Sequence, residues 1–436
     1  MILTLPLAQK NRHLSYLRHQ SQSQNDSSGI QTRLTEVMLA ARSVDIDKEV
    51  ETTDKEADAA DVAGAGKVTA ESVVEEPEVA DNKKIAVHNI AGSEKVINEA
   101  VHEVLVYRKQ YTSEMAAKAV EPTVWTCGDK DRTSLDPVTN QRPFFAFVHV
   151  YKTAGSTIRE FFEEYADICK KSFALVIKCH GLDLESCILK KSVNAPRSIK
   201  SVNSAALHDH YDILGGHFSF GMADDIFPNS ASTSAPQVRH LVFLRQPMTR
   251  FVSKVLYMKL CNDCTVEDTA DYIKNRVRSS RNNGEYISSV YKYLLTPEQR
   301  AMKYEEGQTQ EEVVAHKARL SIDNLVRYNA IIGMTERFPQ SITIMAQAMG
   351  RFASTSEKKQ KEAQDLFSWY YEGKESANVS DKNGITTKSV LKELNKDEEF
   401  MEIFQEFVKY EQMIVDFAME MHQLQYEAVD KRALER

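Results

Sequence analysis

Six consecutive residues have the side chains and the position of an anion-binding loop: Lys152, Thr153, Ala154, Gly155, Ser156 and Thr157. They follow the apolar run 144–151 and precede an amphipathic run, which predicts a strand, a tight loop and a helix. The lysine ammonium, the hydroxyls and the free N–H groups at the helix start would all point at one place beyond the strand. Gly155 is expected to take a positive φ and to let the backbone approach a ligand closely. The stretch therefore predicts a phosphate site.

The order of these residues differs from that of the usual triphosphate loop. In G-x-x-x-x-G-K-[ST] a glycine leads and the lysine stands on the helix side. Here Lys152 comes first and no glycine precedes it in the strand. On this stretch alone, an ordinary strand–helix turn with an exposed lysine remains an alternative. Thr157 and Glu160 match a capping box, so the helix is expected to begin at about Ile158.

A second strand and helix, which follow about ninety residues later, carry a second set of candidate ligands. Residues 240–244 form an apolar strand, Arg245 stands at its C-terminal end, and Pro247 suits the first turn of a helix. Ser253 lies inside that helix. The strands of a parallel sheet end at the same edge, where ligands bind. Arg245 and Ser253 are therefore expected to hold a second phosphate beside the first.

Taken together, the two stretches resemble the sulfotransferases that use 3′-phosphoadenosine 5′-phosphosulfate (PAPS). Residues 152–157, KTAGST, are similar to the 5′-phosphosulfate loop of that family, and 245–253, RQPMTRFVS, resemble its 3′-phosphate motif. The likeness is strongest to the Golgi-type carbohydrate O-sulfotransferases, which 216–221 (GHFSFG) and 333–338 (GMTERF) also fit. Gln246 departs from the pattern, which commonly has an acidic residue or asparagine there.

The resemblance implies transfer of a sulfuryl group from the co-substrate PAPS to a carbohydrate hydroxyl, without a metal. Lys152 would contact the 5′-phosphate and the bridging oxygen, and the rest of the loop would cradle that phosphate. Arg245 and Ser253 would bind the 3′-phosphate. The acceptor hydroxyl needs a base, and His217 is the candidate, with a buried structural histidine as the alternative. An acidic polysaccharide is one option for the acceptor, and the Golgi lumen is the implied compartment.

Alternating strands and helices predict an α/β fold, a central parallel sheet flanked by helices. The resemblance makes it a sulfotransferase fold of the P-loop nucleoside-triphosphate-hydrolase type. The strands are expected at 144–150, 173–178, 211–214, 240–244 and 329–333. Four segments are predicted: a disordered acidic region (1–92), a helical lead-in that starts near Ser93 (93–142), the sulfotransferase domain (143–425) and a tail (426–436). Within the domain, 265–325 is expected to be a polar helical insertion, and 182–200 and 222–236 are expected to be loops.

Charge is concentrated in one segment. Residues 44–82 hold 13 acidic and 3 basic residues, whereas the rest of the chain has 50 acidic and 52 basic residues. So small a basic surplus argues against nucleic-acid binding. No apolar run reaches the roughly 18 residues of a membrane-spanning helix. The start, MILTLPLAQKNRH, lacks a basic region before its apolar patch, so neither a signal peptide nor an anchor is visible there, and a soluble or cytoplasmic chain remains an alternative to the Golgi lumen.

Several weaker signals have structural interpretations. His149 is expected to be structural, and His208 and His210 to lie in a polar loop. Cys261 and Cys264 lack the second ligand pair of a zinc site, and a local disulfide or two thiols are expected. Basic residues 274–281 before three tyrosines suggest either a solvated helix face or a polysaccharide surface. Two other functions remain open, a P-loop-type nucleotide kinase or NTPase and a non-catalytic nucleotide- or glycan-binding protein.

Overall fold

The computed structural model describes residues 111–123, 126–127, 143–179, 187–193, 211–221, 237–258, 264–287, 290–302, 307–350, 353–354, 357–372 and 384–429. The predicted acidic region 1–92 and the start of the lead-in lie outside these residues. So do His208, His210, Cys261 and the segment 222–236. The last helix continues to Ala428, three residues into the predicted tail.

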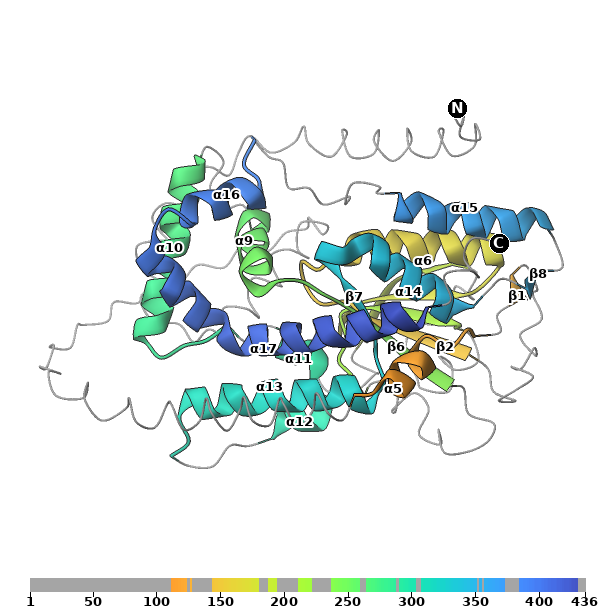
Figure 1. Ribbon diagram of the computed structural model, residues 1–436, viewed down its shortest axis with the longest axis horizontal. Helices are drawn as coiled ribbons and strands as arrows, with labels where there is room; N and C mark the ends of the chain where they lie inside the picture. The colour runs from red at the N-terminus through yellow and green to blue at the C-terminus, as the bar shows by residue number, and fades with distance from the viewer. Residues whose placement is uncertain are drawn as a thin grey trace, which may run out of the picture. The chain divides into compact units, whose positions relative to one another are not determined.

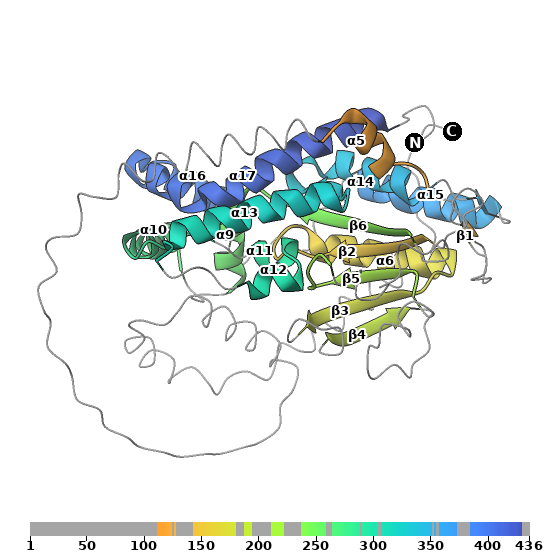
Figure 2. The same cartoon turned by 90° about the horizontal axis from the view of Figure 1, so that it is seen from below.

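A six-stranded sheet has the order β4-β3-β5-β2-β6-β7; Figure 2 shows the part from β4 to β6. Five strands are parallel: β2 (Pro143–Val148), β3 (Phe173–Cys179), β5 (Ile213–Gly216), β6 (Gln237–Leu244) and β7 (Ile331–Met334). The predicted α/β class is confirmed, and each expected strand is present with shifted bounds. β4 (Cys187–Val193), antiparallel to β3, was expected to be part of a loop. Its two lysines are typical of an edge strand and hide the apolar signal. β1 (Thr126–Cys127) and β8 (Ala353–Ser354) form a separate parallel pair.

The central strands are buried on both faces, as their continuous apolar runs predict. Phe145 and Phe147 of β2 pack on one face with α6 (Gly155–Cys169), α14 (Phe338–Met349) and α15 (Glu357–Tyr371). Phe144 and Val148 pack on the other face with residues of α5 (Ser113–Ala119), α13 (Gln310–Arg327) and α17 (Glu398–Ala428). Figure 1 shows α6 and α15 on one side of the strands and α13 on the other.

A third apolar cluster lies in helices beyond the sheet. It joins α9 (Pro247–Tyr257), α10 (Val266–Asn282), α16 (Thr387–Leu394) and the first half of α17 (Figure 1). The predicted polar segment 265–325 is helical and also contains α11 (Tyr291–Leu294) and α12 (Pro297–Ala301). Because α9 belongs to this cluster and follows β6 directly, the cluster fixes the helix that carries Ser253.

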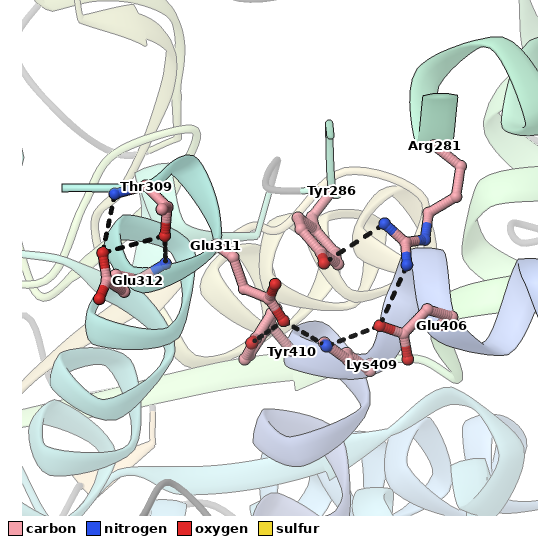
Figure 3. Close-up of polar contacts among 8 residues, drawn as sticks. All are labelled: Arg281, Tyr286, Thr309, Glu311, Glu312, Glu406, Lys409 and Tyr410. Carbon is pink, nitrogen blue, oxygen red and sulfur yellow. Dashed lines mark hydrogen bonds and ion pairs between the residues drawn. The ribbon is translucent and has the colours of Figure 1, made fainter. Parts of the chain in front are cut away.

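A charged network ties α17 to α10 and α13 (Figure 3). The Lys409 ammonium lies 2.5 Å from Glu311 and 2.6 Å from Glu406. The Tyr410 hydroxyl donates to Glu311 at 2.9 Å, and Arg281 pairs with Glu406 at 3.4 Å. Each carboxylate thus meets a cation from another helix, which fixes how α10 and α13 pack on α17.

The basic residues of α10 are engaged within the fold. Lys274 and Arg278 lie 3.1 and 3.4 Å from Asp397, next to the start of α17. The three tyrosines that follow are buried: Tyr286, Tyr291 and Tyr293. They are therefore unavailable for stacking on sugar rings, and of the two interpretations of this patch the structure favours a charged helix face.

Candidate functional site

The candidate site lies where the chain leaves β2 and β6. These strands are neighbours, and Val148 pairs with Val242 near their C-terminal ends. After β2 the chain continues to β3 on one side of the sheet, and after β6 it continues to β7 on the other. Loops that depart in opposite directions leave a crevice between them, and ligands of open α/β sheets bind at such a point. The predicted phosphate loop and Arg245 therefore meet at the place that the topology favours.

The loop after β2 differs in detail from the prediction. Positive φ occurs at Lys152 (65°) and Ala154 (63°), not at Gly155. Helix α6 begins at Gly155, and no side chain caps it. The capping-box prediction was wrong, because Thr157 already lies in the first helical turn. Two non-glycine residues in the left-handed region cost about 1 kcal/mol each, and such strain is concentrated at functional sites.

Gly155 is required for space. A Cβ at this position would lie 1.7 Å from Nε2 of His149. The His149 ring cannot easily move, since it stacks between Phe147 (5.8 Å) and His217 (4.2 Å). Burial, followed by the charge of His217, holds the pKa of His149 well below its usual value, so the ring stays neutral. His149 is structural, as predicted, and it packs the loop against the candidate base.

Gly155→Ala should lower the free energy of unfolding by about 1–3 kcal/mol, the usual cost of overpacking. Chemical denaturation measures this loss. In His149→Ala/Gly155→Ala the ring that meets the new methyl group is gone, so the second substitution should cost little in that background. A double-mutant cycle isolates this coupling. Simple additivity of the two single costs would contradict the role of Gly155.

His217 follows β5 and reaches the same edge of the sheet. Its Nδ1 donates to the backbone oxygen of His149 at 2.9 Å. Because a carbonyl can only accept, this bond places the proton on Nδ1 and leaves the lone pair of the neutral ring on Nε2. Tyr151 stacks on the other side of His217, at 4.8 Å. The ring is thus held in the tautomer that a general base needs.

Lys152 is half-buried, and its ammonium lies 4.2 Å from the ring centroid of Tyr257, the last residue of α9. Burial is the main cause that lowers the pKa of Lys152 to about 8, and the positive charge of Arg245 lowers it further. Sequence reasoning did not identify Tyr257. Its only signal was its spacing, four residues after Ser253 on one helical face.

Arg245 binds the loop directly, since its Nη1 donates to the Lys152 carbonyl at 3.3 Å. Its Nε lies 3.9 Å from Glu336, which also accepts the backbone N–H of Gln246 at 3.1 Å. Glu336 lies in the short helix η2 (Thr335–Arg337) after β7. It supplies the carboxylate that Gln246 lacks, and sequence reasoning missed this role, although Glu336 lies in the matching stretch 333–338.

The remaining predicted ligands differ in their surroundings. Ser253 is buried within α9, and Ser156 is half-buried in the first turn of α6. The Thr157 hydroxyl is buried and has no hydrogen-bond partner among the described residues. Thr153 supports the loop internally, since its hydroxyl donates to the Val150 carbonyl at 2.8 Å. Arg250, whose role the sequence left open, is buried and pairs with Glu411 at 2.5 Å.

Cysteines and metal ligands add little to this site. Cys169 is in a disulfide bond, and so is Cys264, so Cys264 is not one of two free thiols. Within the described parts of the chain, no group of three or more His, Cys, Asp or Glu side chains could hold a metal. No helix in those same parts is long and apolar enough to cross a membrane.

Comparisons of the chain with protein-family models, with curated proteins and with solved structures gave no significant match. The site must therefore be interpreted from its own geometry. Two cations, one aromatic ring and one oriented histidine converge at the C-terminal ends of β2, β5 and β6.

Proposed function

We propose that the chain is a PAPS-dependent sulfotransferase with a sulfotransferase fold of the P-loop type, and that its acceptor is a carbohydrate hydroxyl. One observation carries the proposal: Arg245 donates to the carbonyl of Lys152, so the two stretches that resemble phosphate motifs contact each other. Within the described residues, Glu336 is the carboxylate that pairs with either cation. The two cations therefore exceed this carboxylate by one positive charge, which favours an anionic ligand such as a phosphate.

Sulfuryl transfer needs little more than charge stabilisation and one proton acceptor. The acceptor oxygen forms a bond to sulfur while the bond from sulfur to the bridging phosphate oxygen breaks. The electron pair leaves with 3′,5′-adenosine bisphosphate. Lys152 and the N-terminus of α6 would stabilise the charge that develops on that 5′-phosphate, which lowers the transition state more than the ground state. Nε2 of His217 would take the proton of the acceptor hydroxyl.

The donor's two phosphates would use different elements. The 5′-phosphate would lie on the loop 152–157, where the unpartnered Thr157 hydroxyl is a donor that the described chain leaves unused. The 3′-phosphate would lie at Arg245 and Ser253. Glu336 would hold Arg245 in place through its 3.9 Å ion pair, in the role that an acidic residue at 246 fills in the resembling family.

The carbohydrate class and the compartment rest on the resemblance. The disulfide-bonded Cys169 and Cys264 agree with an oxidising compartment such as the Golgi lumen.

Incubation of the chain with radiolabelled PAPS and a panel of glycans tests the function. Transfer of label to a glycan supports the proposed function. A larger increase in melting temperature with ATP-Mg²⁺ than with 3′,5′-adenosine bisphosphate would support a kinase or NTPase instead. Binding of the bisphosphate without transfer to any acceptor would indicate a non-catalytic binding protein.

Arg245→Ala should weaken binding of 3′,5′-adenosine bisphosphate by about ten- to a hundredfold, the cost of a lost charge-assisted contact. Binding of 5′-AMP, which lacks the 3′-phosphate, should change far less. Calorimetry of both nucleotides measures the difference. Arg327→Ala is the matched control, because Arg327 lies before the start of β7, at the opposite edge of the sheet. Equal losses for the two nucleotides would contradict the assignment of Arg245 to the 3′-phosphate.

A further inference from the structure

The partner of the Lys152 ammonium is an aromatic ring. Its Nζ lies 4.2 Å from the ring centroid of Tyr257. In the described part of the chain, no carboxylate forms an ion pair with this lysine. The positive charge of Arg245 acts on it and lowers its pKa. Burial and this like charge both disfavour the ammonium form, whereas the ring face of Tyr257 favours it.

Tyr257 is placed by the helix that carries Ser253. It ends α9, one turn beyond Ser253, and i,i+4 residues share one face of a helix. Its ring makes an edge-to-face contact with Tyr151, with a centroid distance of 6.4 Å. Tyr151 in turn stacks on His217. Tyr257 therefore contacts Lys152 directly, and it also contacts Tyr151, which stacks on the candidate base His217.

The face of a tyrosine ring carries negative charge density and attracts an ammonium ion within about 6 Å. Side-chain packing alone does not require this residue, since Tyr257 is 46% exposed. Because the face of the Tyr257 ring contacts the half-buried Lys152, Tyr257 can affect the candidate site through this lysine. Burial and the positive charge of Arg245 lower the pKa of Lys152 to about 8, and attraction to the ring face opposes both effects.

We infer that Tyr257 is a positioning residue that keeps the Lys152 side chain charged and directed across the opening of the phosphate loop. The contact itself is independent of the reaction. Its effect on turnover rests on the proposed sulfuryl transfer, because there Lys152 must meet the leaving phosphate as a cation.

Tyr257→Leu and Tyr257→Phe test the role. Leucine retains apolar bulk over the lysine but removes the ring face, whereas phenylalanine keeps the face. After reductive methylation with ¹³C-formaldehyde, NMR follows the dimethyl signal of Lys152, identified by its absence in Lys152→Arg. In the wild type the ring current should shift this signal upfield. Tyr257→Leu should abolish the shift and lower the titration midpoint by about half a unit, and Tyr257→Phe should keep both.

Tyr272→Leu is the matched control, since Tyr272 is an exposed tyrosine of α10, and it should titrate as the wild type does. A Tyr257→Leu spectrum and midpoint identical to the wild type would overturn the inference. In turnover, the loss caused by Tyr257→Leu should be about threefold larger above pH 8 than near pH 6.5. If the wild type transfers no sulfate, the proposed function fails, and the NMR titration still decides the role of Tyr257.

Discussion

Lys152→Ala should reduce sulfate transfer by at least about a hundredfold, the usual effect of removing one group that stabilises transition-state charge. The ammonium is the only side-chain cation on the loop 152–157, and Arg245 is engaged with the loop backbone and Glu336. No other described group in the loop can replace that charge. Single-turnover assays with radiolabelled donor measure the loss, and unchanged turnover would refute the assignment.

The same substitution should leave the fold intact. Alanine keeps a Cβ, so the left-handed backbone at position 152 (φ 65°) costs about as much as before. The lysine makes no ion pair within the described residues, and its cation is disfavoured by burial and by Arg245. The melting temperature of Lys152→Ala should therefore equal or exceed that of the wild type. A marked decrease would mean that lost activity reports unfolding rather than chemistry.

The pH dependence supplies a control for this result. A lysine is charged below its pKa, so with a pKa of about 8 the rate kcat/KM should fall as pH rises through 8. The profile of kcat/KM reports the free enzyme. Lys152→Arg keeps a cation that does not lose its proton in this range. Its residual activity should lack the alkaline decrease, and a decrease at the same pH in this variant would assign the titration to another group.

The sheet and the meeting of the two motifs could be predicted from the sequence. Runs such as 144–148 are continuously apolar, which identifies strands buried on both faces. Parallel strands end at one edge, so residues after β2, β5 and β6 had to converge. That rule placed Lys152, His217 and Arg245 together, and the hydrogen bond from Arg245 to the Lys152 carbonyl agrees with it.

The contacts that tune the site could not be predicted, because they join side chains far apart in the sequence. The spacing of His149 and Gly155 does not reveal that a ring fills the place of a Cβ. The positive φ of Lys152 and Ala154 arises from the loop's path, since neither residue type favours it. Glu336 reaches Arg245 only because β7 lies beside β6. Pairing of distant strands, rather than local propensity, decides such contacts.

His217→Asn should lower kcat by about a hundredfold to ten-thousandfold, the range for loss of a general base. Asparagine is the informative substitution, because its side-chain amide can still donate to the His149 carbonyl, as Nδ1 of the histidine does at 2.9 Å. It offers no basic nitrogen in place of Nε2. The orientation of the neighbouring residues is thus retained while the proton acceptor is removed.

Donor binding separates this role from a merely structural one. His217 belongs to the proton-transfer step, so the affinity of His217→Asn for 3′,5′-adenosine bisphosphate should stay within about threefold of the wild type, a difference below 1 kcal/mol. His316→Asn on α13 is the control for the substitution itself. Loss of nucleotide affinity together with kcat would show that His217 shapes the loop rather than accepting a proton. Wild-type turnover in His217→Asn, with the bisphosphate still bound, would remove His217 from the mechanism and leave Lys152 and Arg245 as the site.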